Sequence, residues 1–281
     1  MTAIVGVLNS QGIAIAADSA VTVSGNNVKK VYNRSNKIFT LSKFHPVGIA
    51  IYNSADFMGI PLETLIKMYR KNLTDEAFDT VEEYKNDFIA FLKSQLKNVS
   101  KEYKVDSFYR FCSWAHMTII NNIIQALDEH ETDIYSLEQD VRTPIFHDIS
   151  NDILNKYSIK LDTFDKVSYM DVSFEDYCSQ YNEELKTIKN YIEEEVNKEY
   201  DGFTLNDEHY EQIKNILYKL INIEFIFENY CGLVFIGFGE TEIYPSSHHV
   251  LVGTSIIDNT RIRMMDVIKI NPGVLNSLCS G

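Results

Sequence analysis

The stretch that decides the fold is TAIVGVLNSQGIAIAADS, residues 2–19. It contains two short apolar runs, TAIVGVL and GIAIAAD, with the polar residues Asn9-Ser10-Gln11-Gly12 at the junction. A polar turn that ends in glycine between two β-rich runs predicts a hairpin. The second run leads straight into Asp18, and a carboxylate at the end of an apolar strand needs a partner, because an unpaired buried charge is costly.

Further strands are predicted near both ends of the chain. KIFTLS (37–42) and PVGIAIY (46–52) follow the hairpin. After Asn53 the apolar residues recur at three and four from Phe57 onward, which predicts a helix that ends near Arg70-Lys71. The strand pattern returns late in the chain, in GLVFIGFG (232–239), HVLVGTSI (249–256) and RIRMMDVIKI (261–270).

Residues 74–230 predict a mostly helical insertion. Apolar residues recur there at helical spacing among Glu, Asp, Lys, Asn and Tyr. Strands followed by helices and then strands are typical of an α+β protein, so we expect one domain over residues 1–281, with the helices packed on the sheet. The clearest apolar stripes run through residues 81–99, YNEELKTIKNYIEEEVNKEY and HYEQIKNILYKLINIEFIF.

Charge and cysteine usage limit the class of protein. The 281-residue chain has a formal net charge of −14. Nucleic acid and anionic membranes attract basic surfaces, so this charge argues against both as partners. The cysteines are scattered, which favours free thiols in a reducing compartment. A signal peptide requires a positively charged segment before its apolar run, and no Lys or Arg precedes the first apolar run here. No apolar run approaches the roughly 18 residues of a membrane span. These features predict a cytoplasmic protein.

Five segments resemble the proteasome β-subunit and HslV family, the Ntn hydrolases that use an N-terminal threonine. The resemblance covers residues 2–73 well and 231–270 moderately, and it does not cover the middle of the chain. It implies an αββα sandwich of antiparallel sheets, enlarged by the helical insertion. The matching segments are TAIVGV (2–7), IAIAADS (13–19), NNVKKV (26–31), SNKIF (35–39) and SAD (54–56).

The resemblance also implies a site at the N-terminus. Removal of Met1 would free the α-amine of Thr2, whose pKa of about 7.7–8.0 lets it serve as the base for its own Oγ. Asp18 falls at the family's spacing from Thr2, and the NVKKV segment points to Lys30 rather than Lys29. The resemblance implies that Lys30 lowers the pKa of the amine and that Asp18 pairs with Lys30 and orients it.

Two departures from the family affect this interpretation. Tyr52 and Asn53 stand where the family has Gly-Gly before its first helix, so the oxyanion is expected to be held by the backbone N–H of Tyr52. The family also continues beyond a Ser-Gly-Ser-like segment, which Ser280-Gly281 would only begin. A complete chain and a fragment truncated at the C-terminus both stay open.

The implied reaction is hydrolysis of a peptide or other amide bond by Thr2, without metal or cofactor. The resemblance implies a homo-oligomer of ring-like form, with any unfoldase partner unspecified. Two alternatives stay open: a catalytically inactive structural or assembly subunit, and an amidase that acts on a small molecule. His248-His249 is interpreted as part of a solvated turn rather than as a zinc site, because adjacent strand residues point to opposite faces.

Overall fold

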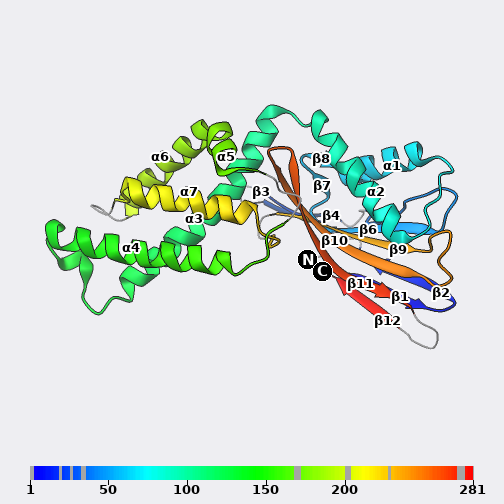
Figure 1. Cartoon of the computed structure of the whole chain (residues 1–281). Coiled ribbons are helices and arrows are strands. Elements are labelled where there is room, and N and C mark those ends of the chain that lie inside the picture. The colour runs from blue at the N-terminus through cyan, green and yellow to red at the C-terminus, as the bar shows by residue number, and fades with distance from the viewer. Residues whose placement is uncertain are drawn as a thin grey trace. The chain divides into compact units, whose positions relative to one another are not determined.

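The structure is a computed structural model that describes residues 3–18, 21–25, 28–32, 36–167, 172–199, 204–226, 229–270 and 276–280 (Figure 1). For 21–25, 28–32, 195–199 and 276–280 it describes the backbone alone. The chain divides into two compact units. We name them the sheet unit (Met1–Tyr103, Asn229–Thr254 and Ile262–Gly281) and the helical unit (Lys104–Glu228 and Ser255–Arg261). The predicted insertion over 74–230 therefore contributes to both units.

The N-terminal hairpin is present and forms part of a three-stranded antiparallel sheet of order β12-β1-β2. Strands β1 (Ile4–Asn9) and β2 (Gly12–Ala17) pair from Ile4↔Ala17 to Asn9↔Gly12. The side chain of Asn9 closes the turn, since its Oδ1 accepts from the backbone N–H groups of Gln11 and Gly12. On the other side of β1 lies β12 (Asn276–Ser280).

A five-stranded antiparallel sheet of order β11-β10-β9-β6-β5 forms the centre of the sheet unit. It consists of β5 (Ile38–Thr40), β6 (Val47–Asn53), β9 (Cys231–Gly237), β10 (Ser246–Ile256) and β11 (Asn259–Lys269). All seven residues of β9 are buried, as expected of a central strand with both faces covered. β3 (Val21–Gly25) pairs with β4 (Val28–Tyr32) in a separate antiparallel sheet.

The two faces of the five-stranded sheet have different neighbours. Ile236 of β9 packs in a cluster with Leu8 of β1, so this face meets the three-stranded sheet. The next residue back, Phe235, points to the opposite face and contacts Phe88 of helix α2 (Val81–Ser94), with ring centroids 5.6 Å apart. Phe88 also contacts Tyr69 of α1 (Leu62–Leu73). The sheet unit is therefore layered as helices, five-stranded sheet and three-stranded sheet.

Helix α1 begins later than the sequence pattern predicts. Phe57 and Ile60 belong to a short hairpin of β7 (Asp56–Phe57) and β8 (Ile60–Pro61), and the helix starts at Leu62. Met58 and Gly59 at the tip have positive φ, 48° and 79°, which no helix allows. The expectation that the helix includes Phe57 and Ile60 is therefore wrong. Phe57 and Ile60 are three residues apart because they face each other across the two-residue tip of the hairpin, and this spacing is the same as that of neighbours on a helix.

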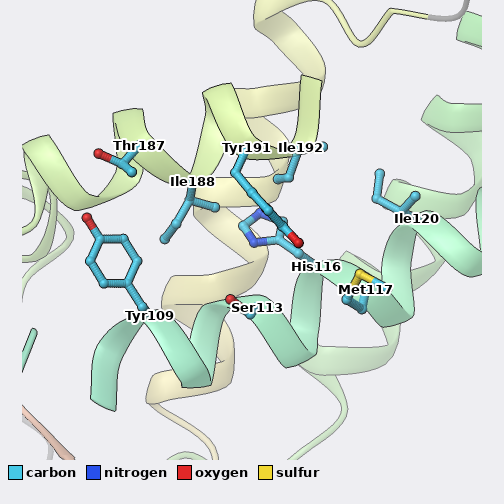
Figure 2. A pocket seen from close by; sticks show the side chains of 9 residues that line it. All are labelled: Tyr109, Ser113, His116, Met117, Ile120, Thr187, Ile188, Tyr191 and Ile192. Carbon is cyan, nitrogen blue, oxygen red and sulfur yellow. The ribbon is translucent and has the colours of Figure 1, made fainter. Parts of the chain in front are cut away.

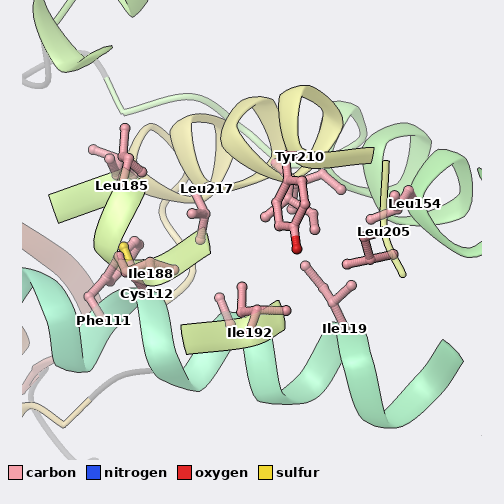
Figure 3. Close-up of a cluster of buried hydrophobic side chains, with 14 of the residues drawn as sticks. Phe111, Cys112, Ile119, Leu154, Leu185, Ile188, Ile192, Leu205, Tyr210 and Leu217 are labelled. Atoms are coloured by element: carbon pink, nitrogen blue, oxygen red, sulfur yellow. The ribbon is translucent and has the colours of Figure 1, made fainter. Parts of the chain in front are cut away.

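The helical unit has its own apolar core (Figure 3). Arg261 is buried at its edge, and its guanidinium donates to the carbonyls of Leu220 and Phe225 after the last turn of α7. A cation at a helix C-terminus satisfies carbonyls that the helix leaves unpaired. The helices of this unit are α3 (Lys101–Asp128), α4 (Gln139–Asp162), α5 (Phe174–Gln180), α6 (Asn182–Glu199) and α7 (Asp207–Ile221).

The α+β class and the antiparallel sheets are confirmed. The interpretation of His248-His249 as a solvated turn is wrong, because both side chains are buried in β10. The argument that adjacent strand residues point apart agrees with the register, in which His248 lies opposite Phe235 and His249 opposite Val234. Across the described ranges, no helix is both long enough and apolar enough to cross a membrane.

Candidate active site

The carboxylate of Asp18 connects three parts of the sheet unit directly after β2. Its Oδ1 accepts a hydrogen bond from the backbone N–H of Ala3 at 3.0 Å. The same oxygen accepts from Nζ of Lys37 at 2.9 Å. The backbone N–H of Asp18 in turn donates to the Ala3 carbonyl at 3.1 Å. One carboxylate oxygen thus links an ammonium group to the residue that directly follows Thr2.

Lys37 is a buried lysine, with 6% of its side chain exposed. Its ammonium lies against Asp18, whose carboxylate is one-third exposed. The hydrogen bond from Lys37, followed by that from the Ala3 backbone, lowers the pKa of Asp18 below its ordinary value. The carboxylate is therefore charged at neutral pH, which is the state that holds a buried ammonium in place.

The predicted catalytic residues are only partly described. Thr2 lies outside the described residues. Lys30 lies in β4, opposite Val23 of β3, and its side chain is also outside the described part. The predicted pairing of Asp18 with Lys30 therefore stays a prediction. Lys37, the ion-pair partner that the structure gives Asp18, lies in the SNKIF segment.

Tyr52 lies inside the five-stranded sheet. The N–H of Ile51 donates to the Lys37 carbonyl at 2.8 Å, on the β5 side of the strand. Successive amides of a strand point to opposite sides, so the N–H of Tyr52 points toward β9, where Gly232 lies opposite. An amide directed into a sheet is poorly placed for an oxyanion. The predicted oxyanion role of Tyr52 stays a prediction that this geometry does not favour.

The side chain of Tyr52 takes part in a buried polar pair. Its hydroxyl and Nε2 of His249 share a hydrogen bond of 2.6 Å. Burial raises the pKa of Tyr52 to about 12 and lowers the pKa of His249, so both are neutral at pH 7. Gly232 makes room for the ring, because a Cβ at that position would lie 2.0 Å from the ring of Tyr52. By register, these residues share the sheet face of Ile236, which packs on the three-stranded sheet.

Asn53 has the backbone conformation that usually belongs to glycine. Its φ is 64°, and its side-chain amide donates to the carbonyl of Tyr230 at 2.9 Å. Asparagine tolerates this left-handed region better than most residues. Of Tyr52 and Asn53, Asn53 is therefore the one at a position with a glycine-like backbone.

The described residues of this site are the ammonium of Lys37 and the carboxylate of Asp18, next to the backbone of Ala3. Within the described part of the chain, no group of three or more His, Cys, Asp or Glu side chains could hold a metal ion. We searched protein-family models, curated proteins and solved structures, and none of them matches this chain.

Sequence reasoning missed two features of this region. Lys37 lies in the SNKIF segment, whereas the resemblance gives the lysine role to Lys30 in the NVKKV segment. The signal that could have found Lys37 is its distance in sequence from Asp18, since it is one of the few lysines that closely follow the hairpin. The pairing of Tyr52 with His249 had no sequence signal, because the two residues are 197 positions apart.

Proposed function

We propose that this chain is an N-terminal threonine hydrolase of amide bonds, with the αββα arrangement of the Ntn hydrolases and a proteasome-like site at Thr2. The observation that carries the proposal is the single oxygen of Asp18 that accepts from both Ala3 and Lys37. It places a charged lysine beside the residue next to the proposed nucleophile. The segment resemblance supports the same assignment.

The chemistry would proceed in two steps once Met1 is removed. The Thr2 Oγ attacks the substrate carbonyl while its proton passes to the Thr2 α-amine. The C–N bond then breaks, the amine product leaves with that proton, and an ester to Thr2 remains. A water molecule, deprotonated by the same α-amine, attacks the ester, releases the acid and restores the Thr2 hydroxyl.

The lysine in this scheme would act through its charge. An ammonium near Thr2 lowers the pKa of the α-amine, which keeps the amine neutral and able to accept a proton. It also stabilises negative charge on the attacking oxygen. Lys37 is buried and paired with Asp18, which suits this role, and Lys30 is the residue that the segment resemblance gives.

The test is a set of single variants, expressed with no residues added before Met1. Intact mass should show that Met1 is absent, and wild-type protein should hydrolyse fluorogenic peptides and react with a threonine-directed epoxyketone. Thr2→Ala should abolish both activities, and Thr2→Ser should retain them in part. If Met1 is retained in the purified protein, or if Thr2→Ala hydrolyses peptides at the wild-type rate, the proposal fails.

Two further variants separate the lysines. If Lys37 holds the active-site charge, Lys37→Met should lower kcat/KM by about 100-fold or more, in the range of acid–base groups, while Lys30→Met changes it little. The opposite result assigns the role to Lys30. Circular dichroism should be unchanged in both, so that the comparison reports on the site.

One observation favours the second candidate, an inactive structural subunit. The Tyr52 amide points into the sheet, and its side chain fills the space over Gly232. A subunit of this kind would show no turnover and no epoxyketone adduct, even with Met1 removed. It would still assemble, as sedimentation of the wild-type protein would show. Assembly into ring-like homo-oligomers and a cytoplasmic location are expected of either candidate.

A further inference from the structure

A cavity of about 350 Å³ lies between helices α3 and α6 of the helical unit (Figure 2). His116, Ile188 and Ile192 form its buried floor. Figure 2 shows the ring of His116 between the two helices, with Tyr109 toward one end of the cavity and Ile120 toward the other. The remaining lining residues, Ser113, Met117, Thr187 and Tyr191, are exposed at the rim.

The residues that line the cavity favour an occupant without charge. None of the nine residues is Asp, Glu, Lys or Arg. A charged group in this cavity would lose its hydration without gaining an ion pair, so the lining suits an uncharged occupant. The isoleucine, methionine and tyrosine side chains of the lining suit a ligand that is mostly apolar, as in most small-molecule sites. The cavity volume also falls in the usual range of such sites.

His116 adds one polar feature to this apolar surface. The residue is 5% exposed, and burial lowers the pKa of its ring to about 4, so the ring is neutral at pH 7. Its Nδ1 has no hydrogen-bond partner among the described residues. The backbone of Cys112, one turn earlier on α3, offsets part of the effect of burial on the pKa of His116. A buried polar atom without a partner is uncommon in folded proteins and calls for a physical explanation.

The volume indicates the size of the occupant. A cavity of about 150 Å³ takes up benzene, so one of 350 Å³ suits a molecule of about two fused rings. We propose that the cavity between α3 and α6 binds an uncharged, mostly apolar molecule of about that size, which carries one hydrogen-bonding group for His116. This site lies within the helical unit and is independent of the proposed hydrolase.

The probe for the test is 2-naphthol, titrated into the full-length protein and followed by saturation-transfer NMR. Ser113→Phe places a ring in the cavity from its exposed rim and should weaken binding by at least tenfold. Ser179→Phe makes the same change at an exposed position of α5 outside the cavity and should leave binding within twofold. In wild-type protein, hydrogen exchange should slow in α3 and α6 when the probe is present, which tests the location even if a variant does not fold.

A second comparison tests the role of His116. His116→Leu should weaken 2-naphthol by about fivefold, the effect of losing one hydrogen bond, and should leave 2-methylnaphthalene within twofold. Equal weakening of both probes would overturn the polar role, because a structural effect would not distinguish them. The charged 2-naphthalenesulfonate should bind more weakly than 2-naphthol.

Three results would overturn the proposed site. The first is equal binding of 2-naphthol to wild-type protein and to Ser113→Phe. The second is tighter binding of the sulfonate than of the naphthol. The third is no binding of any probe together with a wild-type dimer that Ser113→Phe dissociates, because the groove would then be a contact between copies of the chain.

Discussion

The buried imidazole of His116 should make the helical unit lose stability in mild acid. Its pKa is about 4 in the folded protein, against an ordinary value of 6.5. The unfolded chain therefore binds one more proton than the folded chain between these values, so stability falls as the pH drops through this window and is unaffected above it. For pKa values of 4 and 6.5, the loss between pH 7.5 and pH 5 is about 2 kcal/mol.

His116→Leu should remove this contribution. We expect the free energy of unfolding of wild-type protein to fall by about 2 kcal/mol more than that of His116→Leu between pH 7.5 and pH 5. Urea unfolding followed by the fluorescence of Trp114 reports on this unit, because Trp114 is the single tryptophan and lies on the same helix. His130→Leu, at an exposed position, is the matched control and should follow the wild-type curve. Parallel curves for wild-type protein and His116→Leu would refute the reasoning.

Three further predictions concern the sheet unit. Phe88→Ala should lower the free energy of unfolding by about 3–5 kcal/mol, because its fully buried ring packs against Phe235, and an unchanged urea midpoint would contradict this. Tyr52→Phe should cost about 1–3 kcal/mol, because Nε2 of the buried His249 loses its partner, and chemical denaturation at pH 7.5 would measure it. Gly232→Ala should be strongly destabilising, since the added Cβ would lie 2.0 Å from the Tyr52 ring. Tyr52→Ala in the same chain should recover part of that loss, and strictly additive effects would show that the clash is not the cause.

The hairpin was the most predictable part of the fold. Asn9 and Gly12 mark a turn between two apolar runs, and the local chemistry of the turn is enough to fix the pairing of β1 with β2. The start of α1 was less predictable, because Phe57 and Ile60 have helical spacing and yet lie in a hairpin. Periodicity does not register the positive φ of Met58 and Gly59 that separates them from the helix.

The partners of buried polar groups could not be read from the sequence. A partner for Asp18 was expected from the cost of burying its charge, but several lysines lie within twenty residues of it and the sequence does not indicate which one pairs with it. Lys37 was therefore missed although it lies only 19 residues from Asp18. The burial of His249 was missed for a related reason. Strand β10 begins as early as Ser246, so His249 lies well inside the strand rather than in a turn.

The position of β1 has a consequence for how the chain folds during synthesis. This strand has β2 on one side, only a few residues away, and β12 on the other, in register from Ile4↔Ser280 to Leu8↔Asn276. One edge of β1 therefore stays open until β12 has been made, and pairs of such long sequence separation form late. We expect pulse-labelled hydrogen exchange to show the β1–β2 amides protected before those between β1 and β12. The three-stranded sheet would then be completed only when β12 docks on a β1–β2 hairpin that has formed much earlier.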